Sequence, residues 1–544
     1  MGKKVQYLGQ FKRFEISQIG KINFGDLDGE NDSKLADSFF PTQSIRKLFG
    51  MKYNYILSPK GGGKSALFRA MLNTYVPNSL FSSEQFSIIN INSAFNFESE
   101  YLPATKFKDD VSENHYTLAW ALFLLSELIR DIKKHSDKIG YPEIIKKLRK
   151  VDGFKEQYNL YDFSDSVKTI SFTMSFKVNG QDIEVKPAIK IPDNVDKLVL
   201  NQLFVDINEF YKANNITALI IIDRIDNFVR KEKAVIQKKY LQGLINCVEE
   251  IFSLGNVFPM LFIRTDLFYS NELDYEYDKL KGRTLKLDWE DGETLNFIVR
   301  RLLSNRYIKE NYLEYLSHLS QERREGEHDI YKNNILPFYK RIINFFSRKR
   351  NEIDLKRSID YTVAEKFLLL FLPEKIERFQ DSNLCLGLFQ FLQDANGFVN
   401  PRLLIHFFNL LFETQHDFNL KFNSDASQEK AITFKDGQYH FDLFSQDIIP
   451  DVYKIIQNDE LINIYKILKE KELQNLFIEI NKKTSINKTF KSGDFKLKNY
   501  GIDKDQFDSL LKYLGLLGFC KNVEQQTYEI PHLFHCEMSL GEIK

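Results

Sequence analysis

Eight residues near the start of the chain constrain its fold more than any other feature of the sequence. They read SPKGGGKS, at 58–65, and fit the pattern G-x-x-x-x-G-K-[ST] at every fixed position except the first, which is Ser58. The hydrophobic pattern predicts a short buried strand over 53–57 and a helix over 65–72. Between them, successive backbone N–H groups of the three glycines can surround phosphate oxygens at the positive end of the helix dipole. The segment therefore predicts a phosphate-binding loop inside an α/β fold.

Two side chains of this loop would supply the cation and the metal ligand that a nucleoside triphosphate needs. Lys64 would bridge the β and γ phosphates as a point charge, and Ser65 would give its hydroxyl to Mg²⁺. ATP and Mg²⁺ are therefore the predicted cofactors. The alternative is a glycine-rich turn that precedes a helix by chance. The remaining loop residues expected to contact nucleotide are Pro59, Lys60, Gly61, Gly62 and Gly63.

The hydrophobic pattern extends the α/β prediction along the chain. Apolar runs typical of buried strands alternate with segments of helical period, such as 198–211 and 234–252. This alternation predicts a parallel sheet with helices on both faces, the core of a P-loop NTPase. The further predicted strands are 86–92, 216–222, 257–263 and 284–287.

Turn-forming residues and changes in the hydrophobic pattern divide the chain into five parts. About one hundred residues before 198 are too many for a connection, and they are predicted as an insertion with a helix and a β-hairpin at Asn179-Gly180. We expect a surface hairpin there, and a contact arm for DNA or a partner chain is the alternative. The predicted parts are an N-terminal segment with the start of the core (1–92), the insertion (93–197), the remainder of the core (198–290), an α-helical lid (291–422) and a winged-helix-like domain (438–544).

A P-loop needs a second carboxylate on a neighbouring strand to hold Mg²⁺ through water. The apolar run 218–222 ends in Asp223, which is the pattern of such a strand. We therefore expect Asp223 to hold the metal. A helix N-cap is the alternative, since Asp is a favoured cap residue.

Four short motifs occur in a recognisable order: SPKGGGKS, IIIDRID at 220–226, IRTD at 263–266 and NPRLL at 400–404. Together they resemble a bacterial AAA+-like P-loop ATPase, similar to the KAP and STAND groups and to ATPases related to origin-recognition proteins. The resemblance covers residues 40–415. It implies that the chain hydrolyses ATP and acts as a nucleotide-driven switch or machine. It also implies a role in phage defence or signalling, in which such proteins often act.

The resemblance also implies roles for single residues. Many AAA+ proteins carry a water-activating acid directly after the metal-binding aspartate, where this chain has Arg224. The Asp-x-x-Asp spacing of the KAP and STAND groups makes Asp226 the candidate for orienting the attacking water, with capping of the next helix as the alternative. Arg264, at the end of the fourth strand, is the candidate γ-phosphate sensor. Arg402 stands where relatives place the lid arginine that closes over nucleotide.

The sequence also suggests partners. We expect a homo-oligomer. We expect Arg283 to be a solvated surface arginine, and an arginine finger that reaches a neighbouring subunit is the alternative. No second catalytic constellation is recognisable, so effector chemistry is expected in a partner protein, and ATPase turnover is expected to be weak or stimulated by that partner. The alternative functions are a non-hydrolysing nucleotide-binding scaffold, motivated by Arg224, and an ATP-regulated DNA-binding protein.

A lysine-rich stretch in the tail indicates a nucleic-acid contact. Residues 482–498 carry six lysines and one aspartate, interleaved with Phe490 and Phe495, beside the winged-helix-like domain. A solvated loop is the alternative, and a chain without net charge that has one such run slightly favours it. The chain has 75 Lys+Arg and 75 Asp+Glu, so any DNA contact must use a local patch rather than bulk charge. The lysines are Lys482, Lys483, Lys488, Lys491, Lys496 and Lys498.

The remaining sequence patterns concern disulfides, metal sites and membrane segments. The four cysteines lack a C-x-x-C pair, which argues against a disulfide framework or a zinc ribbon and favours the cytoplasm. A zinc site drawn from Cys520, His532, His535 and Cys536 fits structural spacing poorly. The run 25–32 is predicted to be an acidic loop rather than a calcium site. No apolar stretch is long enough to cross a bilayer, so we expect no membrane contact.

Overall fold

The computed structural model divides the chain into two compact units. The core unit comprises Gln43–Lys60 and Leu67–Leu287, and the lid–tail unit comprises Met1–Thr42, Gly61–Ala66 and Asp288–Lys544. The residues that the structure describes are 13–73, 75–76, 85–92, 113–148, 177–178, 181–182, 197–224, 234–270, 280–332, 358–373, 384–422, 429–435, 438–468, 470–524 and 526–539.

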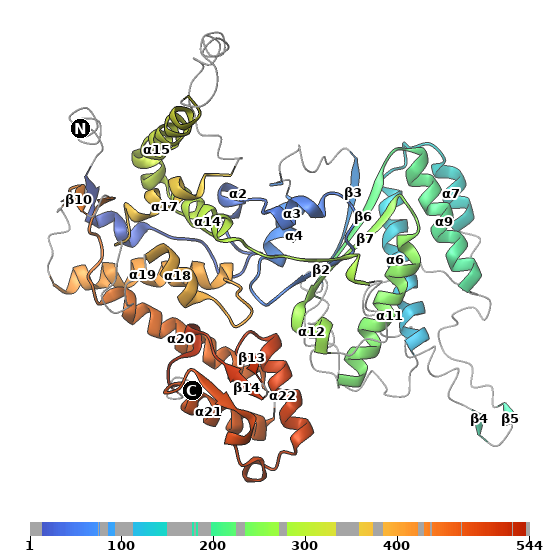
Figure 1. Cartoon of the computed structure of the whole chain (residues 1–544). Coiled ribbons are helices and arrows are strands. Elements are labelled where there is room, and N and C mark those ends of the chain that lie inside the picture. Colours follow the sequence, from blue (N-terminus) through green and yellow to red (C-terminus); the bar gives the residue numbers. More distant parts are fainter. Residues whose placement is uncertain are drawn as a thin grey trace, which may run out of the picture. The chain divides into compact units, whose positions relative to one another are not determined.

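A parallel sheet forms the centre of the core unit (Figure 1). Each strand pairs in parallel with its neighbours. This confirms the predicted parallel sheet and places each strand within a few residues of its expected bounds. In the order in which they lie side by side, the strands are β3 (Phe86–Asn92), β6 (Thr217–Asp223), β7 (Val257–Arg264), β2 (Tyr55–Ser58) and β8 (Thr284–Lys286).

Burial on both faces explains why the strands are continuous apolar runs. In β6, every residue from Ala218 to Asp223 is buried. Alternate β6 residues, such as Ile220, belong to a core shared with helices on one face. On the other face, the Phe68 ring of the helix after β2 meets the Phe262 ring of β7 at 6.5 Å between centroids. Helices therefore cover both faces, as the sequence predicts.

The helices of the core unit arise from segments with helical period. Contacts join α6 to β3, α9 to β6 and α11 to β7, and α6 also packs along α11. Gly243 allows this close approach, because an added Cβ would lie 2.5 Å from the Tyr116 Cβ. The helices are α3 (Gln43–Leu48), α4 (Lys64–Leu72, which begins in the lid–tail unit), α6 (Glu113–Lys133), α7 (Tyr141–Leu148), α9 (Lys197–Ala213), α11 (Ala234–Phe252) and α12 (Thr265–Ser270).

The predicted insertion contains the expected helix and hairpin. The helix is α6, whose Trp120 is buried in the core described above. Strands β4 (Lys177–Val178) and β5 (Gln181–Asp182) pair antiparallel on either side of Asn179-Gly180, which itself lies outside the described residues. The hairpin register is therefore the one that the Asn-Gly turn predicts.

Helices dominate the first part of the lid–tail unit after residue 288, which confirms the predicted lid. The start of α19 follows from its sequence: Asn400 caps it by accepting a hydrogen bond from the Arg402 N–H, and Pro401 stands at a position that needs no N–H. The helices are α14 (Asp291–Leu303), α15 (Arg306–Lys332), α17 (Tyr361–Leu369), α18 (Leu384–Leu392) and α19 (Pro401–Lys421).

The N-terminal segment packs on these helices. The Phe24 ring stacks on Phe408 of α19, with centroids 4.5 Å apart and planes 8° apart. The elements of this segment are β1 (Phe14–Glu15), η1 (Ile16–Lys21) and α2 (Leu35–Ser38). Strand β1 pairs antiparallel with β9 (Glu429–Lys430), and β10 (Thr433–Lys435) pairs antiparallel with β11 (Gln438–His440).

The tail is winged-helix-like, as the sequence predicts. Its helices surround a small antiparallel sheet of order β12-β14-β13. The elements are α20 (Ile448–Ile467), α21 (Lys471–Thr484), β12 (Thr489–Lys491), η3 (Ser492–Asp494), η4 (Leu497–Tyr500), α22 (Lys504–Leu516), β13 (Lys521–Glu524), β14 (Thr527–Glu529) and η5 (His532–Phe534). Within the described ranges, no helix has the length and apolarity needed to span a membrane.

Candidate functional site

Sheet topology identifies where a ligand can bind. Strands β2 and β7 are neighbours, but the connections that follow them run in opposite directions. From β2 the chain crosses to β3, at one edge of the sheet, and from β7 it crosses to β8, at the other edge. In open α/β sheets, ligands bind at the carboxyl ends of the strands at such a switch point. Ser58 and Arg264 are paired residues at the carboxyl ends of these two strands. The SPKGGGKS loop and the predicted sensor arginine therefore start side by side.

The backbone of the loop explains its glycines. Gly61 and Gly63 have φ of +86° and +98°, which side-chain-bearing residues rarely adopt. Helix α4 begins immediately afterwards at Lys64, so the N–H groups of its first turn, which need acceptors outside the helix, follow the glycine curl. Ser58, by contrast, is the last residue of β2, and extended backbone does not require glycine. The departure from the motif at this position therefore leaves the loop geometry intact.

Two side chains of the lid–tail unit lie against the glycines. An added Cβ on Gly61 would be 2.5 Å from the Asn400 Oδ1, so the cap of α19 occupies the space that a side chain at Gly61 would fill. The Trp289 Nε1 donates to the Gly62 carbonyl oxygen at 3.4 Å. From the NPRLL motif, sequence analysis identified only Arg402 as a candidate nucleotide contact. These contacts of Asn400 and Trp289 had no sequence signal.

Asp223 occupies the expected place in the core unit. It is the last residue of β6, is 3% exposed, and is paired in register with Asn92 of β3. The next residue, Arg224, has a φ of +57°, a left-handed conformation that costs a non-glycine residue about 1–2 kcal/mol. The predicted water-orienting residue, Asp226, lies outside the described residues.

Arg264 is oriented by a partner that sequence analysis did not single out. Its Nε donates to the Asp266 Oδ1 at 3.0 Å, and its Nη2 donates to Oδ2 at 2.6 Å. The Asp266 side chain is only 4% exposed, and that of Arg264 is 20% exposed. A two-point contact of this kind fixes the plane of the guanidinium. The signal in the sequence was the Arg-x-Asp spacing where a strand passes directly into a helix.

Arg402 and the acidic loop 25–32 meet in the lid–tail unit. The Arg402 Nε donates to the Leu27 carbonyl oxygen at 2.9 Å. Asp32 of the loop forms an ion pair with Arg301 of α14, with Nη2 and Oδ2 2.6 Å apart and both side chains at most 3% exposed. The loop therefore holds the N-terminal segment against α14, which agrees with its prediction as a loop rather than a calcium site.

Arg283 lies at the amino-terminal end of the strands, whereas the SPKGGGKS loop leaves the carboxyl end of β2. It directly precedes β8, and its carbonyl oxygen accepts from the N–H of Tyr55, the first residue of β2. Its guanidinium contacts the Glu249 Oε2 at 2.7 Å and lies 3.9 Å from the centroid of the Phe252 ring. The arginine is thus held within its own chain, which differs from a solvated surface residue. The arginine finger and the homo-oligomer stay predictions.

The residues considered for zinc have other roles. Burial raises the pKa of the Cys520 thiol to about 12, and the His535 Nε2 lies 2.8 Å from the Ile530 carbonyl oxygen. In the part of the chain that the structure describes, no group of three or more His, Cys, Asp or Glu residues is arranged to hold a metal.

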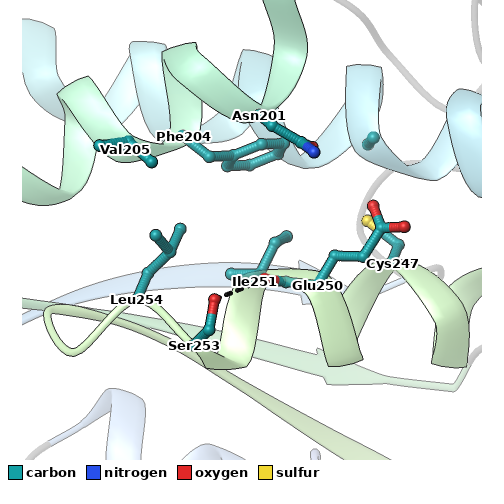
Figure 2. A pocket seen from close by; sticks show the side chains of 9 residues that line it. Asn201, Phe204, Val205, Cys247, Glu250, Ile251, Ser253 and Leu254 are labelled. Atoms are coloured by element: carbon teal, nitrogen blue, oxygen red, sulfur yellow. Dashed lines mark hydrogen bonds between the residues drawn. The ribbon is translucent and has the colours of Figure 1, made fainter. Parts of the chain in front are cut away.

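The core unit also contains a cavity of about 290 Å³. Figure 2 shows Phe204 and Val205 of α9 facing Ile251 of α11 and Leu254, which follows α11, across the cavity. The polar contact drawn there is local, from the Ser253 Oγ to the Glu250 carbonyl oxygen at 3.1 Å. None of the lining residues belongs to the glycine loop or to a strand end, so the cavity is separate from the candidate site.

Comparisons with known proteins give a distant likeness. No protein-family model matches the chain, and no curated protein matches it. The Walker-type ATPase PABY2304 of Pyrococcus abyssi is similar over 91% of this chain and 95% of its own, at 12% identity and a TM-score of 0.34. The ORC2 protein of Aeropyrum pernix, solved as ADPNP-ADP complexes, is similar over 92% of this chain and 94% of its own, at 11% identity and a TM-score of 0.38. Likeness at this level carries no argument about function, so the site is argued from the geometry of this chain.

Proposed function

We propose that the chain binds Mg-ATP, hydrolyses it, and uses the nucleotide state as a switch. One observation carries the proposal: the glycine loop leaves β2 at the topological switch point, passes through Gly61 and Gly63 at positive φ, and enters a helix at Lys64. A strand, a glycine curl and a helix N-terminus in this order form a site for a polyphosphate.

Each proposed role follows from the chemistry of the side chain. The Lys64 ammonium would neutralise charge between the β and γ phosphates. The Ser65 hydroxyl would be a direct Mg²⁺ ligand, and the Asp223 carboxylate would hold the hydrated metal. The metal would shield the phosphate charge during transfer. Arg264, with its guanidinium plane fixed by Asp266, would contact the terminal phosphate.

The contacts of the glycines support a switch. Gly61 lies against Asn400, which caps the first turn of α19, and Arg402 of the same turn is bonded to the Leu27 carbonyl. A nucleotide that reshapes the glycine curl would therefore act directly on the first turn of α19. We propose that lid movement couples hydrolysis to a partner protein that carries the effector chemistry.

Lys64→Ala tests the proposal. The variant keeps the loop amides but loses the cation, so we expect ATP affinity to fall roughly ten- to a hundredfold, as expected for losing a charge-assisted contact worth about 1.5–3 kcal/mol. Isothermal titration with Mg-ATP measures this. Lys52→Ala makes the same change at an exposed lysine outside the glycine loop and is the matched control. Equal affinity in wild type and Lys64→Ala would contradict the P-loop assignment.

A non-hydrolysing scaffold is the second candidate, and Arg224 is the observation that favours it. This residue adopts a left-handed conformation directly after Asp223, where the resemblance implies an acid. The scaffold predicts tight Mg-ATP binding with no phosphate release in a single-turnover assay, with or without DNA. Phosphate release that is lost in Asp226→Asn would exclude the scaffold and give Asp226 the water-orienting role.

A role in phage defence is the most specific part of the proposed function. It rests on the sequence resemblance alone. Phage plating on cells that carry the wild-type chain or Lys64→Ala tests it, and equal plating on both would remove defence from the proposal.

A further inference from the structure

Exposed positive charge in the tail is concentrated in one short segment. Lys483 is partly buried, and its Nζ lies 2.9 Å from the Asp494 Oδ2. Hydrogen bonding to Lys483 lowers the pKa of Asp494, which keeps this pair charged. Since Asp494 is the single acidic residue of 482–498, its charge is balanced inside the segment. We call the remaining exposed lysines the lysine surface: Lys482, Lys488, Lys491, Lys496 and Lys498.

The lysine surface stands on folded structure. Helix α21 packs against both β12 and η4, and β12 is an edge strand paired only with β14. The Lys488 carbonyl oxygen accepts a hydrogen bond from the Ile530 N–H at 3.0 Å. The field of the Lys488 charge adds to burial in lowering the pKa values of His532 and His535. The charges are therefore carried by a defined surface rather than by a loose loop.

The rest of the winged-helix-like fold lacks such an excess. The exposed face of α22 carries Lys504 and Lys512, and Asp505 and Asp508 balance them. The hairpin of β13 and β14 exposes one lysine, Lys521, and two glutamates. An anionic partner would therefore be drawn to the lysine surface and not to α22 or the hairpin.

The positions of the two aromatic residues in 482–498 distinguish between single-stranded and duplex nucleic acid as the partner. Phe490 and Phe495 are 1% and 8% exposed, and their ring centroids lie 5.7 Å apart. The two rings are interleaved with the lysines in the sequence, but in the fold they form the core beneath the lysine surface. Single-stranded nucleic acid is usually bound by stacking bases on exposed rings. A duplex offers closely spaced phosphates and needs no stacking.

We propose that the lysine surface binds the phosphate backbone of duplex DNA without reading its sequence. The five exposed lysines predict a slope of log K against log salt of about −4.5, since each phosphate contact contributes about 0.9. This inference does not rest on the nucleotide site, because it uses none of the residues of the glycine loop.

Fluorescence anisotropy with the full-length chain and a labelled duplex, measured over a salt series, tests the proposal. The test variant is Lys488→Gln with Lys491→Gln, which keeps most of each side-chain stem. The control is Lys504→Gln with Lys512→Gln, which makes the same charge change at exposed positions of α22. We expect the test variant to flatten the slope by about two units and to weaken binding tens of times near 0.1 M salt. The control should keep the wild-type slope.

Three results would overturn the proposal. One is that test and control variants lose affinity and slope equally, which would make the effect one of net charge. Another is that the wild-type chain binds no duplex at low salt. The third is that it binds vesicles containing phosphatidylserine and that duplex DNA does not displace them. All substituted lysines are exposed, so thermal unfolding of both variants should match wild type and exclude misfolding as a cause.

Discussion

Replacing Asp394 with asparagine should stabilise the protein at neutral and alkaline pH. Asp394 lies in the turn between α18 and α19, where its Oδ1 accepts from the N–H groups of Asn396 at 2.8 Å and Phe398 at 2.9 Å. The turn docks on the end of α22, because the Ala395 N–H donates to the Gly518 carbonyl oxygen at 2.7 Å. The carboxylate itself lies against Gly518, which has no Cβ and a φ of +79°.

Burial raises the pKa of Asp394 from 3.8 to about 6, although hydrogen bonds from Phe398 and Asn396 oppose the rise. A carboxyl group whose pKa is raised on folding contributes its full stability below the unfolded pKa, and this is lost as the pH rises through the folded pKa. The difference of about two pKa units corresponds to about 3 kcal/mol at pH 8, and about half of that at pH 5. Asparagine stays neutral and keeps the Oδ1 acceptor.

Thermal and urea unfolding at pH 5 and pH 8 measure the effect. We expect Asp394→Asn to exceed wild type in stability at both values, with the larger gain at pH 8. Asp508→Asn, at an exposed position of α22, is the matched control for the change in net charge and should show no such gain. A gain in Asp394→Asn that is absent, or that does not grow between pH 5 and pH 8, would refute the assigned cause.

Other substitutions address the candidate site. Asp223→Asn should retain much of the nucleotide affinity and lose Mg²⁺-dependent turnover, measured by phosphate release; undiminished turnover would move the metal role to another residue. Gly61→Ala should weaken ATP binding, because its φ of +86° and the nearby Asn400 both disfavour a Cβ. The double variant Gly61→Ala with Asn400→Ala separates these two causes, since it removes the collision but leaves the strained φ. Asp266→Asn should remove one of the charges that orient Arg264, and a lower kcat with unchanged thermal stability would support a positioning role.

The sequence was sufficient for features that a short segment determines by itself. Strand β6 was predictable because a fully buried strand is an unbroken apolar run, and the start of α19 because Asn-Pro is a local cap signal. The glycine loop was predictable for the same reason, since positive φ at Gly61 and Gly63 is a local requirement.

Contacts between distant segments were not predictable. The ion pair of Arg283 with Glu249 joins residues that are apart in sequence, and nothing near either one indicates the other. The burial of Phe490 was missed because an alternation of lysine and phenylalanine is typical both of a nucleic-acid contact and of a strand with one buried face. Only the pairing of β12 with β14 distinguishes them.

The ion pair between Asp32 and Arg301 also sets an order of events during synthesis. Asp32 emerges from the ribosome 269 residues before its partner Arg301. The interval between Phe24 and Phe408, the ring on which it stacks, is longer still. At about 5–20 residues per second, the N-terminal segment would remain without its partners for roughly 13–54 seconds. During that time its apolar side chains would be available to chaperones, and folding of the lid–tail unit would finish only after translation has passed α19. A slow rate of synthesis would therefore lengthen the period in which this segment is exposed to proteases and to aggregation.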